Sequence, residues 1–416
     1  MFEEAVRTEA WASDHSPALA LAGPSPEPPP LLARGVAPRS AWVEVDLGKL
    51  RRNFDLIRRQ LPLQVHLLSV VKDDAYGHGA LPVARVAVAA GASFLAVSTI
   101  EEAVALRESG IDARILMLGD RHESELPWCL AHDLTCCVTE PEGIRKLAAL
   151  AARFERRIPV HLKVNTGMNR YGTHWTTASQ TAELIHASPS LRLEGILSHF
   201  AQSDGPDKAL AAVQLERFQA VVKRMADAGV QAPLRHMANS GAFLEIPAAR
   251  FEMVRLGILP LGVYPSAECR RLEGIEPVMT VKARIASIQQ LRPGDGSGYG
   301  IRFKASRPTR LGVLPIGYGD GYPYSRNRGS VLIHGRRAPV VGATAMDAIT
   351  VDLTDIPEAR LWDEATVMGQ QGTEEISAQE IADLNGSIPY QLLTAWRTRL
   401  PQSYLHPASR EALPTA

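Results

Sequence analysis

The sequence predicts an α/β protein in which a (β/α)8 barrel of the TIM type is followed by a mainly antiparallel β domain. The first observation is a set of eight short apolar runs that alternate with helical patterns, near residues 66–72, 93–99, 113–119, 134–138, 158–165, 193–199, 234–238 and 251–256. The second is that the first run leads into Lys72, and no G-x-G-x-x-G motif follows, which disfavours a doubly wound nucleotide-binding sheet. The third is a change near Glu276 to short runs broken by Gly and Pro, which is typical of antiparallel strands.

These patterns divide the chain into three parts. Residues 1–40 include Pro28-Pro29-Pro30 and are expected to form a disordered or extended lead. Residues 41–272 are expected to form the barrel and residues 273–416 the β domain. Within the β domain the strands are expected at 278–288, 311–315, 330–334, 338–341 and 350–353, with one helix at 377–384.

Composition excludes several classes of partner. The 416 residues are 45% hydrophobic and 22% charged, with a formal net charge of zero, so neither nucleic acid nor an anionic membrane is an expected partner. No apolar run approaches the roughly 20 residues needed to cross a bilayer.

The four cysteines form no Cys-x-x-Cys pair, and the adjacent Cys136 and Cys137 should face opposite sides of a strand. We interpret them as apolar residues of a cytoplasmic protein, with no metal site.

Polar residues gather where the predicted barrel strands end. Lys72 ends the first strand, His199 the sixth and Arg255 the eighth, while Arg170 follows the fifth and Asn239-Ser240 the seventh. The carboxyl ends of barrel strands meet at one face, so these side chains should line a cationic cavity suited to phosphate. A desolvated lysine there can form an imine with an aldehyde. Each residue alone has an ordinary reading as a surface charge, a structural histidine or a turn; their joint placement favours a site.

The segment Val70-Val71-Lys72-Asp73-Asp74-Ala75-Tyr76-Gly77-His78-Gly79 resembles the cofactor-lysine motif of alanine racemases, and the resemblance runs from about residue 41 to about residue 401. It implies a cofactor, pyridoxal 5'-phosphate (PLP), attached to Lys72. It also implies that Arg255 bonds the PLP ring nitrogen with His199 behind it, and that the remaining cofactor-binding residues are Tyr76, Asn239, Ser240, Gly257, Ile258 and Tyr390. Because an arginine keeps its proton, the ring nitrogen should stay unprotonated, which discourages decarboxylation and transamination.

The resemblance also implies how the substrate is handled. Lys72 and Tyr299 would be the acid–base groups on the two faces of the substrate Cα atom, with Tyr299 supplied by the other chain of a head-to-tail homodimer. The substrate-binding residues would be Arg170, Met346, Asp347 and the channel residue Tyr318. Lys163 matches a lysine that some family members carry as a carbamate. Three positions depart from the usual family residues: Asp73, Asn165 and Ala345 stand in place of alanine, aspartate and cysteine.

The expected function is therefore PLP-dependent racemisation of alanine, supplying D-alanine for peptidoglycan. A serine or broad-specificity amino-acid racemase is the alternative within the same reaction class. A decarboxylase on the same two-domain plan is opposed by Arg255, because such enzymes place a carboxylate at the ring nitrogen. A non-catalytic PLP carrier is opposed by the β domain that bears Tyr299.

Overall fold

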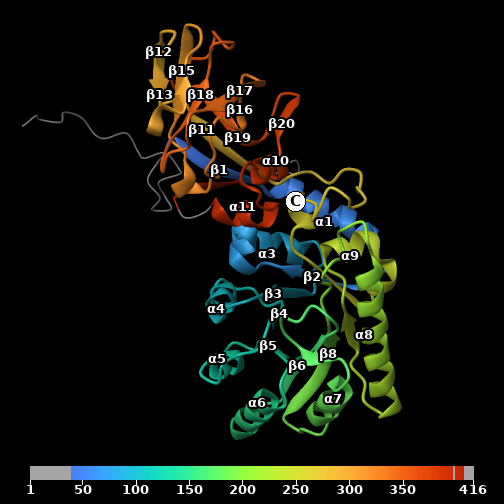
Figure 1. Cartoon of the computed structure of the whole chain (residues 1–416). Coiled ribbons are helices and arrows are strands. Elements are labelled where there is room, and N and C mark those ends of the chain that lie inside the picture. Colours follow the sequence, from blue (N-terminus) through green and yellow to red (C-terminus); the bar gives the residue numbers. More distant parts are fainter. Residues whose placement is uncertain (1–38, 397–398, 407–416) are drawn as a thin grey trace, which may run out of the picture. The chain divides into compact units, whose positions relative to one another are not determined.

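The structure is a computed structural model that describes residues 39–396 and 399–406 (Figure 1). The predicted lead over residues 1–40 therefore lies outside the described residues except for Arg39 and Ser40.

Eight parallel strands in the described part of the chain form an almost closed barrel, in the order β10-β2-β3-β4-β5-β6-β8-β9. Their bounds are β2 (His66–Val70), β3 (Phe94–Val97), β4 (Arg114–Met117), β5 (Thr135–Val138), β6 (Ile158–Asn165), β8 (Leu191–Leu197), β9 (Leu234–His236) and β10 (Met253–Leu256). A two-residue strand, β7 (Thr173–His174), extends β6. Between β9 and β10 the Arg255 N–H donates to the Ala238 carbonyl at 2.9 Å, just beyond the end of β9. The predicted barrel is confirmed: seven of the eight expected runs contain one of its strands, and the run at 193–199 overlaps β8, which begins two residues earlier.

Helices cover the outer side of these strands, as Figure 1 shows for α4 to α8. The helices of this region are α1 (Leu47–Arg59), α3 (Ala80–Ala89), α4 (Ile100–Glu108), α5 (Leu126–Ala131), α6 (Pro141–Arg153), α7 (Ala178–His186), α8 (Ala209–Asp227) and α9 (Ser240–Glu245). The Asp46 carboxylate caps α1 by accepting from the Lys49 N–H at 2.8 Å. The face of α1 that carries Leu50, Phe54 and Ile57, residues spaced by four and three, is fully buried.

The barrel strands separate two apolar clusters. The inner cluster consists of Leu68, Phe94, Ala96, Leu116, Cys137, Leu197 and Met253. Cys136 belongs instead to the large outer cluster that includes the helix faces, so the prediction that adjacent cysteines face opposite sides is confirmed. All four cysteines are buried and unpaired.

The second region is a ten-stranded, mostly antiparallel sheet within the described residues. Its strands are β1 (Ala41–Asp46), β11 (Met279–Arg284), β12 (Ser287–Leu291), β15 (Thr309–Leu314), β16 (Ser330–Ile333), β17 (Arg336–Val341), β18 (Ile349–Asp352), β19 (Glu364–Gln371), β20 (Glu374–Ile376) and β21 (Gln402–Leu405). A separate hairpin joins β13 (Gly296–Ser297) to β14 (Phe303–Lys304), and two short helices, α10 (Ala378–Ala382) and α11 (Pro389–Ala395), follow β20. The predicted antiparallel domain is confirmed. The run expected at 278–288 forms two strands, β11 and β12, and β13, β14, β19, β20, β21 and α11 were not expected from the sequence.

Strand β1 belongs to this second sheet. Val43 pairs with Val281 of antiparallel β11 on one side and with Gln402 of parallel β21 on the other. Burial alternates along β1, since Ala41, Val43 and Val45 are buried and the residues between them are partly exposed, but such alternation does not determine which sheet a strand joins. The division of the chain at residues 272 and 273 stays a prediction.

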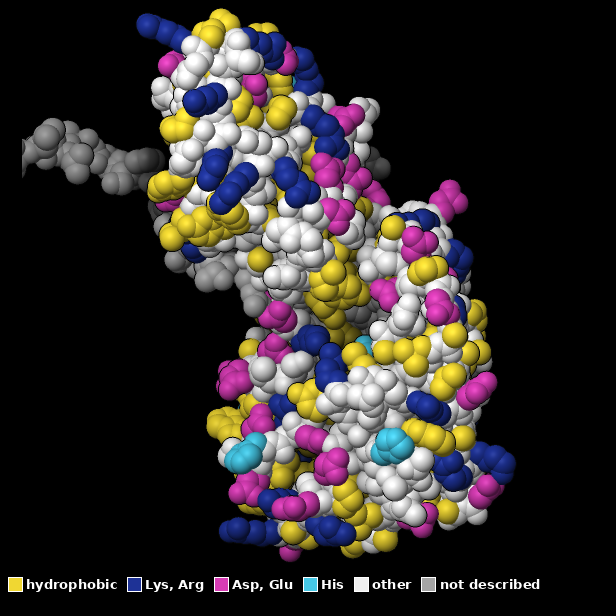
Figure 2. All heavy atoms as spheres, in the orientation of Figure 1, with side chains coloured by type: hydrophobic (Ala, Val, Ile, Leu, Met, Phe, Trp, Pro, Cys, Tyr) yellow, Lys and Arg dark blue, Asp and Glu magenta, His cyan; other side chains and the backbone are white. Residues whose placement is uncertain are grey.

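Charges of both signs are distributed over the surface. On the face drawn in Figure 2, Lys and Arg side chains are interspersed with Asp and Glu, in keeping with a formal net charge of zero. Among the residues that the structure describes, no helix combines the length and the apolar character that a membrane span requires.

Candidate active site

A cavity of about 460 Å³ lies at the carboxyl ends of the barrel strands. It brings together most of the residues singled out in the sequence: Lys72, Tyr76, Lys163, Arg170, His199, Asn239, Ser240, Arg255, Gly257, Ile258 and Tyr390. Tyr390 comes from α11, far along the chain, and its ring lies 6.0 Å from the Tyr76 ring, centroid to centroid. One chain therefore builds this cavity from both of its regions.

Lys72 lies two residues past Val70, the last residue of β2, rather than at the end of the strand itself, and it is partly buried. Its burial and the nearby Arg170 lower its pKa from the ordinary value, while Glu102 and Asp73 oppose that effect. A larger fraction of neutral amine is therefore available near neutral pH, which is the form that attacks an aldehyde.

The segment α2 (Lys72–Gly77) has an unusual backbone. Asp73, Asp74, Ala75 and Tyr76 all have left-handed conformations, with φ between 51° and 55°. Each such residue costs about 1–2 kcal/mol relative to a right-handed turn, so the segment needs external support. The sequence does not indicate this conformation, because nothing in these residue types requires left-handed backbone.

Part of that support comes from within the loop. The Asp74 carboxylate accepts from the Ala80 N–H at 2.7 Å, and the His78 Nδ1–H donates to the Tyr76 carbonyl at 3.0 Å. The Gln402 side chain donates to the Gly77 carbonyl at 2.8 Å. A Cβ atom at Gly77 would lie 2.3 Å from the Leu393 carbonyl oxygen, so glycine is required for α11 to approach this loop.

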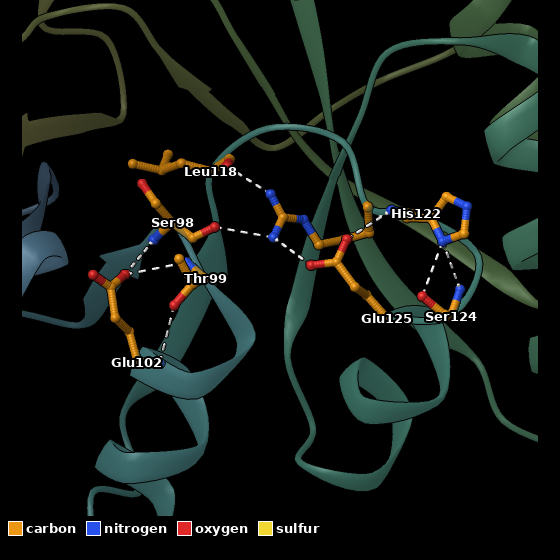
Figure 3. A network of polar contacts seen from close by, with 8 residues as sticks. Ser98, Thr99, Glu102, Leu118, His122, Ser124 and Glu125 are labelled. Atoms are coloured by element: carbon orange, nitrogen blue, oxygen red, sulfur yellow. Dashed lines mark hydrogen bonds and ion pairs between the residues drawn. The ribbon is translucent and has the colours of Figure 1, made fainter. Parts of the chain in front are cut away.

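Glu102 of α4 supports the first residue of the left-handed turn. Its Oε1 accepts from the Asp73 N–H at 2.5 Å, while Oε2 accepts from the Ser98 and Thr99 N–H groups at 2.8 and 3.1 Å. Figure 3 shows Glu102 reaching back from the first turn of α4 to Ser98 and Thr99. One carboxylate thus joins the end of β3, the start of α4 and the residue after Lys72. The sequence analysis did not select Glu102, although Thr99-Ile-Glu-Glu102 is the sequence signature of a capping box.

Tyr76, Ser240 and Gly257 form a cradle on another side of the cavity. A Cβ atom at Gly257 would lie 2.4 Å from the Tyr76 hydroxyl oxygen, so this close approach depends on glycine. The Ser240 hydroxyl accepts from the Leu259 N–H at 3.4 Å. Burial raises the pKa of Tyr76 and of Tyr390, so both phenols remain hydrogen-bond donors at neutral pH.

Arg255 is held on the buried side of the cavity. Its Nη1 donates to the His236 carbonyl at 2.8 Å, and its Nη2 donates to the Ser198 carbonyl at 2.7 Å and to His199 Nδ1 at 3.1 Å. Burial lowers the pKa of Arg255 to about 10, which leaves it cationic at neutral pH. Burial and the Arg255 charge hold the pKa of His199 well below its ordinary value, so His199 is a neutral acceptor.

Lys163 and Arg170 lie at another edge of the cavity, where Arg170 is exposed and Lys163 is buried. Burial is the main cause of a lowered pKa at Lys163, and its ammonium nitrogen lies 5.2 Å from the centre of the Tyr171 ring. Carbamylation of Lys163 stays a prediction.

Four predicted residues do not line this cavity in the single chain: Tyr299, Tyr318, Met346 and Asp347. All four are exposed, Tyr299 by 79%. Backbone hydrogen bonds hold Tyr318 and Met346 close together, since the Tyr318 N–H donates to the Ala345 carbonyl and the Gly319 N–H to the Met346 carbonyl. We call these four residues the exposed set. The predicted residues that line the cavity, named with it above, are called the cavity set.

The cavity also contains residues that the sequence analysis missed. Ser98 and the pair Leu118-Gly119 line it just after β3 and β4. Their position in the last residues of the expected runs 93–99 and 113–119 was the available signal, and it is the same signal that selected Lys72 and His199.

The donor set fits PLP. A lysine with a lowered pKa suits the aldehyde, and the hydroxyls of Tyr76, Ser240 and Tyr390 suit the phosphate. The buried guanidinium of Arg255 suits an unprotonated ring nitrogen. The cradle is also open only because residue 257 carries no side chain. Fold and site together define a barrel enzyme that uses PLP.

Comparison with known proteins gives the family. The family model "Alanine racemase, N-terminal domain" matches residues 45–265, and "Alanine racemase, C-terminal domain" matches residues 278–404. The chain belongs to the alanine racemase family, whose members are PLP-dependent isomerases, and the resemblance found in the sequence is confirmed.

Named relatives agree over most of the chain. Alanine racemase of Syntrophobacter fumaroxidans is 41% identical over 353 residues, which cover 85% of this chain and 94% of that protein. The solved alanine racemase of Streptomyces coelicolor A3(2) is 36% identical with a TM-score of 0.82, covering 88% of this chain and 98% of that one. The solved biosynthetic alanine racemase of Pseudomonas aeruginosa is 34% identical with a TM-score of 0.80, covering 89% of this chain and 100% of that one.

Proposed function

We propose that this enzyme interconverts L- and D-alanine, with Lys72 and Tyr299 as its two proton carriers. The observation that supports this most is the cavity set itself, in which a lysine of lowered pKa, a buried arginine fixed by hydrogen bonds and several hydroxyl groups line one cavity. The relatives named above are alanine racemases, which supports alanine as the substrate. When bound, PLP supplies the electron-withdrawing system that makes the Cα proton of an amino acid removable.

Each face of the substrate Cα atom needs its own acid–base group. Lys72 Nζ takes or returns the proton on one face, and its lowered pKa makes neutral amine available for this near neutral pH. The Tyr299 hydroxyl serves the opposite face. Exchange of the configuration requires both, because one base alone would return the proton to the face from which it came.

We infer that Tyr299 reaches the cavity of a second copy of the chain in a head-to-tail homodimer. Tyr299, Tyr318 and Met346 are exposed by 79%, 44% and 56%, which is an unusual amount of large apolar surface for one small region. In a two-fold dimer each copy gives its exposed set to its partner and receives the same set in return.

The two sets divide the binding of a small amino acid. Arg170 on the exposed edge of the cavity offers a guanidinium to the substrate carboxylate, and the Met346 N–H of the partner copy offers a second donor. Tyr318 and Asp347 of the partner narrow the entrance, which favours a side chain as small as methyl. Asn165 and Ala345 leave the substrate range open to test against serine.

Arg255 favours proton exchange over other reactions of PLP. A guanidinium keeps its proton, so it acts only as a donor toward the ring nitrogen. This opposes the decarboxylase alternative. We expect the D-alanine product to serve peptidoglycan synthesis, in the cytoplasm, where reduced cysteines such as the four buried ones are usual.

Mixing two inactive variants tests both the residue roles and the dimer. Lys72→Ala and Tyr299→Phe are each expected to lose alanine racemisation when alone. Coexpressed with different tags, they should form about half heterodimers, each with one intact site of two, and so recover about one quarter of the parent activity.

No recovery on mixing would contradict the shared site, and parental activity of Tyr299→Phe alone would contradict the two-base assignment.

A panel of single L-amino acids tests the substrate. Faster racemisation of serine than of alanine would replace the alanine assignment with the broader one.

A further inference from the structure

A line of buried polar side chains leads from the cavity into the interior of the barrel. Arg255 Nη1 lies 3.1 Å from His236 Nδ1, His236 Nε2 lies 2.8 Å from His161 Nδ1, and His161 Nε2 lies 3.3 Å from Glu194 Oε2. All four residues are at most 5% exposed. None of the last three lines the cavity, so the proposed chemistry does not use them directly.

We infer that Glu194 is a positioning residue that acts on Arg255 through His161 and His236. It fixes which ring nitrogens carry hydrogen and thereby where the Arg255 guanidinium can donate. This inference rests on the proposed contact between Arg255 and the PLP ring nitrogen.

The direction of every link follows from its two ends. A guanidinium can only donate, so His236 Nδ1 must accept and His236 Nε2 must carry the hydrogen. His236 Nε2–H then donates to His161 Nδ1, which leaves His161 Nε2–H to donate to Glu194. A carboxylate can only accept, so both ends require the same pair of tautomers.

Glu194 is kept as an anion. The Arg114 and Arg192 guanidinium groups both donate to its Oε1, at 2.8 and 2.9 Å. Burial opposes ionisation, but the His161 hydrogen bond and these two arginines bring the pKa of Glu194 down to about 2. Burial lowers the pKa of His161 and of His236, so both rings stay neutral between the two charged ends.

The backbone leaves room for this line. A Cβ atom at Gly195 would lie 2.7 Å from both Cε1 and Nδ1 of His161, so only glycine next to Glu194 accommodates the ring. Hydrogen bonds in series polarise one another in a dry interior, which lets a charge at Glu194 affect a donor at Arg255.

Replacement of the Glu194 carboxylate by an amide should reverse the direction of the hydrogen bonds that join residue 194, His161 and His236. In Glu194→Gln the amide oxygen still accepts from Arg114 and Arg192, so the amide NH2 group faces His161 Nε2. Both histidines must then carry hydrogen on Nδ1, and His236 Nδ1–H would face the Arg255 Nη1–H group. Two opposed donors cannot bond, so the guanidinium must shift.

Nitrogen-15 NMR of the histidine-labelled holoenzyme measures this directly, because protonated and unprotonated ring nitrogens have separate chemical shifts. The signals are assigned by their loss in His161→Asn and His236→Asn. The parent should show hydrogen on Nε2 of both rings, and Glu194→Gln should show it on Nδ1, with PLP bound about tenfold more weakly. Arg192→Gln is the matched control, since it keeps the carboxylate and should keep the parent tautomers.

Gly195→Ala provides a second route if Glu194→Gln folds poorly, because it displaces the His161 ring and leaves Glu194 in place. It should likewise weaken PLP binding and change the His236 signals. Parent tautomers in Glu194→Gln, or reversed tautomers in Arg192→Gln, would overturn the inference. The NMR result is independent of alanine turnover, so failure of the proposed function is distinguishable from failure of this inference.

Discussion

The cavity set and the exposed set are built differently. Arg255 is 5% exposed and makes side-chain hydrogen bonds to residues of two neighbouring strand ends, whereas Tyr299 is 79% exposed at the hairpin between β13 and β14. The first arrangement is organised before any ligand arrives, and the second obtains its surroundings from another molecule in the proposed dimer. The difference indicates that cofactor binding is a property of one chain and racemisation a property of two.

Acid should affect the barrel region that contains the cavity most, because the histidines buried in and around the cavity are neutral. Burial lowers the pKa of His78 to about 4 and also lowers the pKa of His161, His199 and His236. An unfolded histidine titrates near 6.5, so between pH 6.5 and 4 the unfolded chain binds more protons and stability falls as the pH falls. His78 alone should account for about 3 kcal/mol of unfolding free energy by pH 4.

Urea unfolding at several pH values measures this loss. His78→Asn should flatten the acid slope, while replacement of the exposed His186 by Asn should leave it unchanged. Stability that does not fall between pH 6.5 and pH 5 would show that the cavity region is not the acid-sensitive part.

Gly257→Ala should weaken the cradle without involving the exposed set. The new Cβ atom would meet the Tyr76 hydroxyl at 2.4 Å, so the tyrosine must move away and PLP affinity should fall by about tenfold or more. Titration of the apoenzyme with PLP gives the affinity. Gly143→Ala is the control, because a Cβ atom there meets nothing within 4 Å. Equal affinities for the two variants would contradict the assigned cradle.

Of the three changes, namely acid, Gly257→Ala and Glu102→Gln, Glu102→Gln should have the smallest effect. In the parent, the N–H groups of Asp73, Ser98 and Thr99 donate to the two carboxylate oxygens of Glu102, whereas a glutamine amide has only one acceptor oxygen. The hydrogen bonding that supports the left-handed turn should therefore weaken by about 1–2 kcal/mol. Loss of the negative charge should also lower the pKa of Lys72 further, because Glu102 raises it in the parent.

The rate at which apoenzyme takes up PLP across a pH series reports that change. Its acid limb should move to lower pH in Glu102→Gln and remain in place in Glu101→Gln, whose side chain is exposed. An acid limb that does not move would show that the Glu102 charge is not felt at Lys72.

The barrel and much of the cavity set could be predicted from the sequence, because both depend on local patterns. Each barrel strand overlaps a contiguous apolar run, and Lys72, His199 and Arg255 could be selected because each lies at or next to the end of an expected run. In the structure Lys72 and His199 each lie two residues past the strand, and Arg255 is the third residue of β10. The β11, β15 and β16 strands were found in the same way.

Features that depend on distant partners could not be predicted. The left-handed backbone of Asp73–Tyr76 is stabilised by Glu102 and Gln402, which lie far from it in the sequence. The membership of β1 in the second sheet depends on β11 and β21, and Glu194 reaches Arg255 only through two other strands. Whether Tyr299 enters a cavity depends on a second molecule.

The position of β1 between β11 and β21 has a consequence for synthesis on the ribosome. Residues 41–46 are made before every other strand of the described chain, yet one neighbour in the sheet is made some 230 residues later and the other is residues 402–405. The barrel strands can pair while the chain is still growing, but β1 must wait with an unpaired edge until nearly all of the chain has emerged. We therefore expect nascent chains stalled before residue 400 to carry a protease-resistant barrel and a protease-sensitive β1.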